Sequence, residues 1–490
     1  SDMGCYGGEI QTPNLEKLAQ EGIRFNSFYN ASRSCPTRAS LLTGLYPHQA
    51  GIGRMTFNDN LPRYRGQLTE NGVTIAEVLK EAGYQTGMVG KWHIAETPLK
   101  SDQREWLAHH VYHEDFADKA CYPVNRGFDD FYGIIYGVAN YFDPFSLVNG
   151  DIPVRNVPKD YYITRALSDS AVSYVNRYAN ADKPFFLYLS YTAPHWPLHA
   201  LPEDIKKYEN TYKVGWDAIR EKRYERMKEL GIFSGADNFL TTRQSPKKWE
   251  DNPTKEWDAR AMAVHAAMVD RMDQGIGELI DALEKNNQLD NTLILFLSDN
   301  GCSEVCQNYS EGENDRPDMT RIGEKIIYPR KKEVLPGSEL SYASIGPIWA
   351  NVANTPFRFW KAKSYEGGIN TPLIAFWPKG INKGKGGITN QPGHVIDIMA
   401  TCIDLAKAKY PKKYQGNSIL PLEGKSLVPI LKGSKRKGHE YLGFEHFNEK
   451  ALIAKDGWKI IQPGNKAQWE LYNLNEDRTE MHNVADKYPD

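Results

Sequence analysis

Thr292-Leu-Ile-Leu-Phe-Leu297 is an apolar run that ends in Ser298-Asp-Asn-Gly301 and follows a long amphipathic segment, residues 257–283. Apolar side chains recur in that segment every three or four positions, which is the period of a helix with one buried face. A short apolar run bounded by turn residues is typical of a buried strand. The stretch therefore predicts a helix over 257–283 that leads into a strand over 292–297.

Three other runs have the same character as this strand, at 84–89, 184–191 and 373–377. Helical periodicities lie between them, and this alternation predicts an α/β fold with a mixed, mostly parallel sheet flanked by helices. Ligands of such sheets bind at the carboxyl ends of the strands. We therefore expect the site where these runs end, with residues 96–125 and 306–345 as loops over that edge.

The sequence changes character after residue 413. Short apolar runs separated by turns predict a small antiparallel sheet, with strands at 441–444, 451–453, 458–461 and 469–472. We therefore divide the chain into a catalytic α/β domain, residues 1–413, and a C-terminal α+β subdomain, residues 414–490.

Composition excludes several classes of protein. The 60 Lys and Arg against 62 Asp and Glu give a net charge of −2, so no basic excess indicates a nucleic-acid partner. No apolar run approaches the ~20 residues needed to cross a bilayer. The six cysteines are too sparse for a disulfide scaffold. We expect buried or free thiols, with a single disulfide as the alternative.

Residues 34–44, Ser-Cys-Pro-Thr-Arg-Ala-Ser-Leu-Leu-Thr-Gly, place a hydroxyl group and an arginine at the start of a predicted helix. The free N–H groups and the positive dipole end of a helix N-terminus attract an oxyanion. On these grounds Ser34 either lies at an oxyanion site or simply caps the helix.

Cationic side chains and imidazoles follow two of the predicted strands. Lys91 and His93 come after the run 84–89, and residues two apart on an extended segment point to the same side. His195 follows the run 184–191. These groups can bind an anion and move protons, whereas a solvated lysine and packed histidines are the alternative on spacing alone.

Oxygen ligands follow a third strand. Asp299 and Asn300 close the strand 292–297, and hard oxygen donors suit Ca²⁺ or Mg²⁺ rather than zinc. A bare Asp-Asn-Gly is more often a turn. Lys361 lies four residues before Tyr365-Glu-Gly-Gly368.

Taken in order, these segments resemble the motifs of the sulfatase family over nearly the whole chain. Ser-x-Pro-x-Arg at 34–38 with its Leu-Thr-Gly is similar to the family signature, Gly90-Lys-Trp-His93 to its Gly-Lys-Trp-His motif, and Lys361 to its sulfate-binding lysine. Ser34 rather than Cys35 is in register with the proline and arginine. The resemblance implies an alkaline-phosphatase-like fold and an arylsulfatase-like sulfuric ester hydrolase.

The resemblance also implies the role of each site residue. Ser34 would be oxidised to Cα-formylglycine, whose hydrate is the nucleophile. Arg38 would orient the hydrate. Lys91, His195 and Lys361 would bind the sulfate, His195 would also protonate the leaving alcohol, and His93 would remove a proton so that sulfate is released. Asp299, Asn300 and residue 34 would bind Ca²⁺, with Mg²⁺ as the alternative.

One departure from the family pattern concerns the cation. Family members open with a strand that ends in two metal-binding aspartates, shortly before a segment like Asp2-Met-Gly-Cys-Tyr-Gly-Gly8. We read the sequence as trimmed at both ends, and we expect a sheet that lacks its central strand and a weakened cation site.

The resemblance further implies a sulfated small molecule or glycan as substrate, a radical maturase that makes the formylglycine, and a periplasmic or secreted location. Two alternatives stay open: a phosphate or phosphonate monoester hydrolase of the same superfamily, and a non-catalytic relative that binds sulfated glycans.

A few other residues invite a functional interpretation. His109, His110 and His113 are expected in a solvated loop rather than a metal site. Tyr141, Phe142 and Trp349 either contact the substrate or pack in the core.

Overall fold

The computed structural model describes residues 1–97, 116–233, 240–305, 319–320, 322–328 and 333–488. The two predicted loops fall partly outside these ranges. His109, His110, His113 and Cys306 lie wholly outside the described residues.

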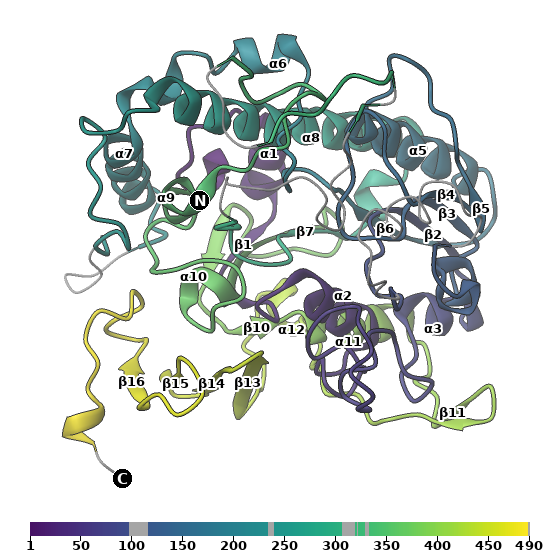
Figure 1. Ribbon diagram of the computed structural model, residues 1–490. Helices are drawn as coiled ribbons and strands as arrows, with labels where there is room; N and C mark the ends of the chain where they lie inside the picture. Colours follow the sequence, from purple (N-terminus) through teal and green to yellow (C-terminus); the bar gives the residue numbers. More distant parts are fainter. Residues whose placement is uncertain (98–115, 234–239, 306–318, 321, 329–332, 489–490) are drawn as a thin grey trace.

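The body of the protein contains two five-stranded sheets (Figure 1). The first has the order β10-β1-β8-β7, with β9 also paired to β1. Its strands are β1 (Ile23–Tyr29), β7 (Ile294–Leu297), β8 (Asn370–Phe376), β9 (Gly387–Thr389) and β10 (Gly393–His394). β1 runs parallel to β9 and β10 and antiparallel to β8.

The second sheet has the order β5-β4-β3-β2-β6. Its strands are β2 (Gln85–Gly90), β3 (Asp130–Ile134), β4 (Leu147–Asn149), β5 (Ile152–Pro153) and β6 (Phe185–Ser190). β2 is parallel to both β3 and β6, so the chain segments that follow β2 and β6 leave the sheet at the same edge.

Helices cover both faces of the sheets, as expected for this fold class. Figure 1 shows α1, α5, α6 and α8 on one side and α2, α3 and α11 on the other. The helices are α1 (Pro13–Glu21), α2 (Ser34–Thr43), α3 (Ile75–Glu81), α5 (Ile163–Tyr178), α6 (Pro202–Lys206), α7 (Trp216–Glu229), α8 (Lys255–Lys285), α9 (Gly346–Ala353), α10 (Glu366–Ile369), α11 (Ile396–Ala406) and α12 (Val428–Leu431). The predicted mixed α/β fold is confirmed.

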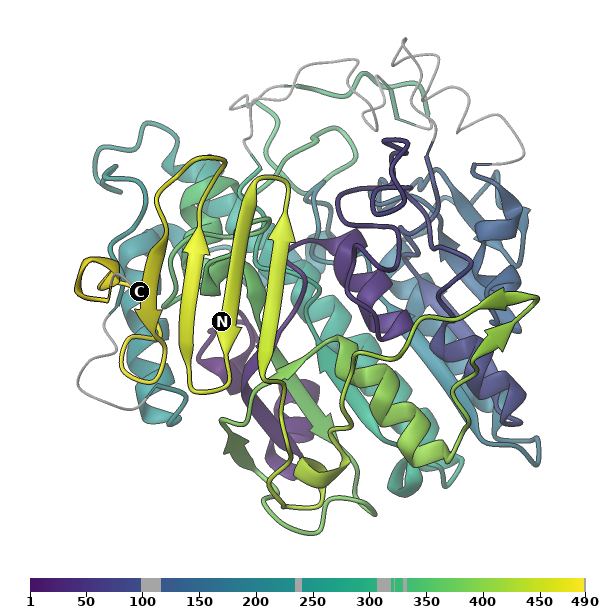
Figure 2. The ribbon, with the colours of Figure 1, turned by 90° about the horizontal axis from the view of Figure 1, so that it is seen from below.

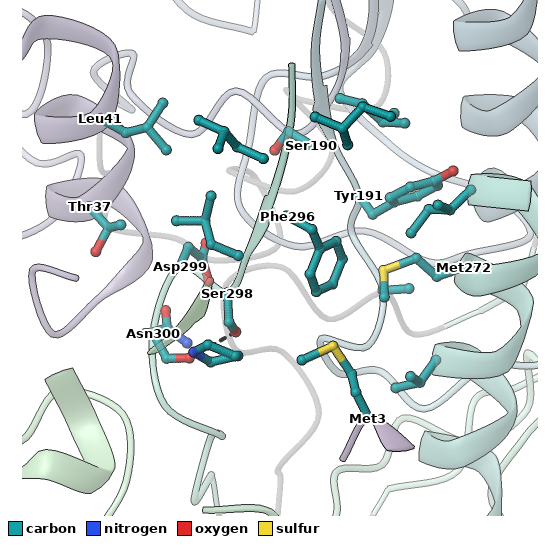
Figure 3. Close-up of a pocket in the computed structure, with 18 of the residues that line it drawn as sticks. Met3, Thr37, Leu41, Ser190, Tyr191, Met272, Phe296, Ser298, Asp299 and Asn300 are labelled. Carbon is teal, nitrogen blue, oxygen red and sulfur yellow. Dashed lines mark hydrogen bonds between the residues drawn. The ribbon is translucent and has the colours of Figure 1, made fainter. Parts of the chain in front are cut away.

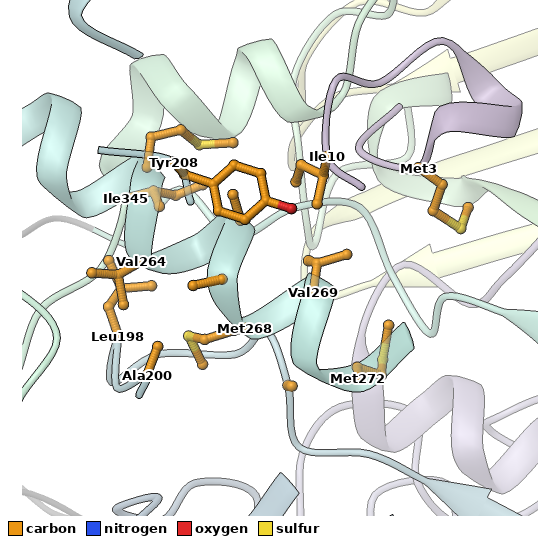
Figure 4. Close-up of a cluster of buried hydrophobic side chains, with 14 of the residues drawn as sticks. Met3, Ile10, Leu198, Ala200, Tyr208, Val264, Met268, Val269, Met272 and Ile345 are labelled. Carbon is orange, nitrogen blue, oxygen red and sulfur yellow. The ribbon is translucent and has the colours of Figure 1, made fainter. Parts of the chain in front are cut away.

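The long helix α8 forms where the three-to-four periodicity predicts it. Its apolar face supplies Val264, Met268 and Met272 to a buried cluster that also contains Tyr208 (Figure 4). Burial of apolar side chains of this size contributes about 1.5–3 kcal/mol each. His265 lies on the same face, and its Nε2 is 2.9 Å from a carboxylate oxygen of Asp2.

A four-stranded antiparallel sheet follows near the C-terminus (Figure 2). Its strands, in sheet order, are β13 (Tyr441–His446), β14 (Glu449–Ala454), β15 (Trp458–Gln462) and β16 (Glu470–Asn473). Buried Lys459 of this sheet lies 2.9 Å from Glu366 of α10 and 2.6 Å from Glu480. The predicted C-terminal sheet is confirmed, while the domain boundary at residue 413 stays a prediction.

The two large sheets meet across one cavity. β6 and β7 are edge strands, and every residue of both lines a cavity of about 790 Å³ (Figure 3). Within the described part of the chain, no strand pairs with the open edges of β6 and β7. Apolar side chains such as Phe296 form much of the wall, and Asp299 lies at the polar end.

Two expectations from composition can also be compared with the structure. The cysteines within the described ranges are free thiols: Cys5, Cys35, Cys121, Cys302 and Cys402. In the same ranges, we find no helix with the length and apolarity needed to span a bilayer.

Candidate active site

Ser34 is the first residue of α2, and its side chain is buried. Its Oγ accepts a hydrogen bond from Arg38 Nε at 2.9 Å, because residues i and i+4 share one face of a helix. His93 Nδ1 lies 3.5 Å from the same oxygen. The imidazole also contacts Cys35, whose Sγ is 3.3 Å from His93 Nε2. Burial raises the pKa of the Cys35 thiol.

Arg38 connects three strand ends. Its guanidinium donates to Asp299 Oδ2 at 2.7 Å after β7 and to the Lys91 carbonyl at 2.8 Å after β2. It also donates to the Ser190 hydroxyl at the end of β6. Sequence reasoning did not identify Ser190, and its place next to the end of the strand predicted over 184–191 is the signal that would have pointed to it.

Asp299 and Asn300 lie at the polar end of the cavity (Figure 3), and Asp299 pairs with Arg38 at 2.7 Å. Burial opposes ionisation of Asp299, but the neighbouring Arg38 and Lys91 outweigh it and lower the pKa of that carboxyl. The amide of Asn300 donates to the Gly301 carbonyl at 2.9 Å, whereas its Oδ1 is buried and finds no hydrogen-bond partner among the described residues. Such an oxygen is costly unless something binds it.

Two lysines are buried at this end of the cavity. Burial, with Arg38 close by, lowers the pKa of Lys91 to about 7. Burial and then Arg33 lower the pKa of Lys361 to about 8. Both shifts arise because cations are desolvated near one another with few carboxylates among them. Lys361 is held in place by its backbone N–H, which donates to the Cys302 carbonyl at 3.1 Å.

His195 lies against Lys361. Its Nδ1 is 2.7 Å from the Trp196 carbonyl, which can only accept, so Nδ1 carries the proton in the neutral ring. Nε2 then accepts from Lys361 Nζ at 3.2 Å. Burial and Lys361 lower the pKa of His195. Tyr141, predicted either to contact the substrate or to pack in the core, donates its hydroxyl hydrogen to the His195 carbonyl at 2.9 Å.

The remaining candidates are structural. Tyr141 and Trp349 are buried in the core, so the packing alternative is the one observed for these rings. Phe142 packs against His199, with ring centroids 5.6 Å apart. His199 is fully buried, and its Nε2 donates to the Ser341 carbonyl at 2.8 Å.

The predicted site residues therefore converge from distant parts of the chain. Arg38, Lys91, His195 and Lys361 line the cavity with Asp299 and Asn300, while Ser34 and His93 contact each other beside Arg38. The cationic groups of Arg38, Lys91 and Lys361 act on the carboxylate of Asp299, with the imidazole of His195 beside them. An arrangement of this kind can bind an oxyanion and stabilise negative charge that develops on it.

Comparisons with known proteins agree with this geometry. The family model described as "Sulfatase" matches residues 1–408. A second model, described as "N-sulphoglucosamine sulphohydrolase, C-terminal", matches residues 357–489. The chain is 33% identical over 523 residues to an uncharacterized sulfatase of Schizosaccharomyces pombe, covering 100% of this chain and 88% of the relative.

An arylsulfatase of Klebsiella aerogenes is 31% identical over 454 residues, covering 88% of this chain and 89% of that protein. Among solved structures, a protein crystallised in complex with k-i-k-neocarrahexaose superposes with a TM-score of 0.64 at 26% identity. That match covers 98% of this chain and 84% of the other.

Proposed function

The chain belongs to the sulfatase family and is a sulfuric ester hydrolase, and on this premise we propose that it cleaves glycan or aryl sulfates at Ser34 after oxidation of that residue to formylglycine. The observation that carries the proposal is the position of Ser34. It lies at the start of α2, in contact with Arg38 and His93. The same guanidinium reaches Asp299 and the end of β2, so residue 34 is held where the cationic groups converge.

Lys91 and Lys361 hold the sulfate group. Both ammonium groups are buried, so their charge is little screened by water and acts strongly on sulfuryl oxygens. Lys361 also fixes the orientation of His195 through the hydrogen bond to Nε2. The bound ester is thereby placed with its leaving oxygen near an imidazole.

His195 and His93 handle protons in this proposal. The neutral His195 ring carries its proton on Nδ1, so Nε2 must gain one before it can protonate the leaving alcohol. A negatively charged ester next to the ring favours that charged form. General acid help of this kind contributes about 10²–10⁴ in rate. His93, 3.5 Å from Ser34 Oγ, is placed to accept a proton from residue 34.

A divalent cation fits part of this site. The orphaned Asn300 Oδ1 and the carboxylate of Asp299 are hard oxygen donors on adjacent residues. With an oxygen on residue 34 they would hold Ca²⁺ or Mg²⁺. The ion, when bound, would supply positive charge that favours ionised oxygen at residue 34 and on the substrate. Ca²⁺ takes about 6–8 oxygen ligands, so other oxygens must complete its shell.

The proposal includes maturation by a radical enzyme and a periplasmic or secreted location. Both rest on the serine in the first position of the motif at 34–38. A glycan substrate is supported by the oligosaccharide complex of the structural relative, and a sulfated sugar by a relative that is 26% identical, an N-acetylglucosamine-6-O-sulfatase of Bacteroides thetaiotaomicron.

The test is a paired assay on protein produced together with a maturase. Hydrolysis of 4-nitrophenyl sulfate is compared with that of 4-nitrophenyl phosphate, for the wild type and for Ser34→Ala. We expect turnover of the sulfate ester that disappears in the variant. A clear preference for the phosphate ester, or undiminished sulfate turnover by Ser34→Ala, would reject the proposal.

A further inference from the structure

The turn between β13 and β14 brings an exposed aromatic ring next to the site. His446 pairs with Glu449, so the turn consists of residues 447 and 448. Phe447 is 44% exposed, and its backbone has φ of 54°, a left-handed conformation. Two-residue hairpins usually place Gly or Asn in that conformation, and bulky side chains rarely adopt it. Phe447 is not buried, and the conformation of the turn favours Gly or Asn, so neither feature explains why a phenylalanine occupies this position.

The β13–β14 hairpin is hydrogen-bonded to the segment that follows Lys361. Glu449, at the start of β14, accepts a hydrogen bond from the Ser364 N–H at 3.0 Å and pairs with Lys363. Both partners lie within three residues of Lys361. On its other side, Tyr64 donates to Glu445 at 3.3 Å. The turn is therefore fixed relative to the sulfate-binding lysine.

Arg33 joins this turn to the nucleophile. It directly precedes Ser34, and its guanidinium carbon lies 5.7 Å from the centroid of the Phe447 ring. Within the described ranges, the Arg33 side chain has no carboxylate partner, whereas nearby Arg54 pairs with Asp59 at 2.9 Å. The Ala362 N–H donates to the Ser32 carbonyl at 2.8 Å, which holds the Arg33 and Lys361 segments together.

We propose that Phe447 and Arg33 form the subsite for the ring that carries the scissile sulfate. Phe447 packs against the apolar face of that ring, and Arg33 binds a second anionic group on it. The preferred substrates are then sugars with two anionic groups rather than singly charged sulfate esters. This inference rests on the proposed function, since it places the sulfate of the substrate at Lys91 and Lys361.

An exposed aromatic ring gains by burying its surface against a ligand ring, and such contacts are typically worth a few-fold to tenfold in affinity. An unpaired guanidinium gains more from an anion than a paired one, because no protein carboxylate has to be displaced. Both groups are available beside residue 34 without rearrangement of the hairpin.

The experiment measures binding of two matched probes by titration calorimetry. N-acetylglucosamine 6-sulfate carries one anionic group, and glucosamine 2-N,6-O-disulfate carries two. Binding is measured in the Ser34→Ala background so that the probes are not consumed. In that background we expect the disulfate to bind about tenfold more tightly, the effect of one charge-assisted hydrogen bond.

Four further substitutions are compared in the same background. Arg33→Gln should remove the preference for the disulfate, and Phe447→Ala should weaken the binding of both probes about five- to tenfold. Phe447→Tyr should bind as the parent does. Tyr441→Ala is the matched control, because Tyr441 is an exposed aromatic residue at the opposite end of β13, and it should leave both affinities unchanged.

The outcomes separate this inference from the proposed function. Any of three results would overturn the subsite: the Arg33→Gln variant still prefers the disulfate, the Phe447→Ala variant binds both probes with unchanged affinity, or neither probe binds measurably. If wild-type protein hydrolyses 4-nitrophenyl sulfate while these variants bind as the parent does, the proposed function stands and the subsite falls. If the expected binding pattern appears without hydrolysis, the subsite stands and the catalytic proposal fails.

Discussion

Removal of the Tyr141 hydroxyl tests whether the loop that carries His195 must be held rigidly. Tyr141 is 1% exposed, and its hydroxyl donates to the His195 carbonyl at 2.9 Å. Tyr141→Phe leaves that partly buried carbonyl without this donor, which should lower the free energy of unfolding by about 1–2 kcal/mol. The loop would then hold the imidazole less firmly against Lys361, and we expect kcat to fall roughly three- to tenfold.

Tyr162 provides a matched control. It is 2% exposed, and its hydroxyl donates to the His199 carbonyl at 3.0 Å, four residues further along the same segment. Tyr162→Phe should cost similar stability but leave kcat unchanged, because His199 is bonded into the core rather than lining the cavity.

The assay combines urea unfolding with steady-state hydrolysis of 4-nitrophenyl sulfate by both variants. Equal losses of kcat in the two variants would show that the effect is general loosening. An unchanged kcat in Tyr141→Phe would refute the positioning role of its hydroxyl.

Three further predictions follow from the contacts described. Lys361→Ala should lower kcat/KM for an aryl sulfate by roughly 10²–10³-fold, because one buried cation no longer neutralises the sulfuryl oxygens; a loss below about threefold in steady-state kinetics would contradict this. Burial opposes ionisation of Asp397, but hydrogen bonding with His439 and the charge of Arg436 lower its pKa from 3.8 to about 2. The ionised carboxylate therefore stabilises the folded protein above pH 3.8, and this stabilisation is lost as the pH falls towards 2. Urea titrations should show the stability difference between wild type and Asp397→Asn shrinking over that window, and a constant difference would rule this out. Chelation of divalent cations should lower activity and Tm, and added Ca²⁺ should restore both. The Asn300→Ala variant should lose the Tm response to Ca²⁺, and a response equal to that of the wild type would exclude Asn300 as a ligand.

Periodicity in the sequence located part of the regular core. The helix expected over 257–283 is α8, and the strand expected over 292–297 contains β7, because both bury long apolar surfaces with a clear period. The strand β1 was not predicted. Its sequence, Ile-Arg-Phe-Asn-Ser-Phe-Tyr, alternates imperfectly, and its register with β8 shifts between Phe25 and Phe28.

The site could be predicted only in part. Residues next to strand ends, such as Lys91 and Asp299, were accessible because the apolar run before each of them marks where a strand ends. Their approach to each other across two separate sheets was not. Ser190 was not predicted, and neither was the hydrogen bond from Tyr141 to the His195 carbonyl, since a hydroxyl that bonds to a guanidinium or a carbonyl has no pattern in the sequence. The separation of the two large sheets at β6 and β7 likewise depends on long-range pairing that local periodicity does not encode.

The central claim is that residue 34 acts only after oxidation, and peptide mass tests it most directly. Trypsin releases Ser34–Arg38, and conversion to formylglycine removes two hydrogens, so the peptide becomes about two mass units lighter. Across preparations made with different amounts of maturase, we expect sulfate-ester turnover to rise in proportion to the light fraction. Full turnover from protein in which this peptide is entirely unmodified would contradict the account.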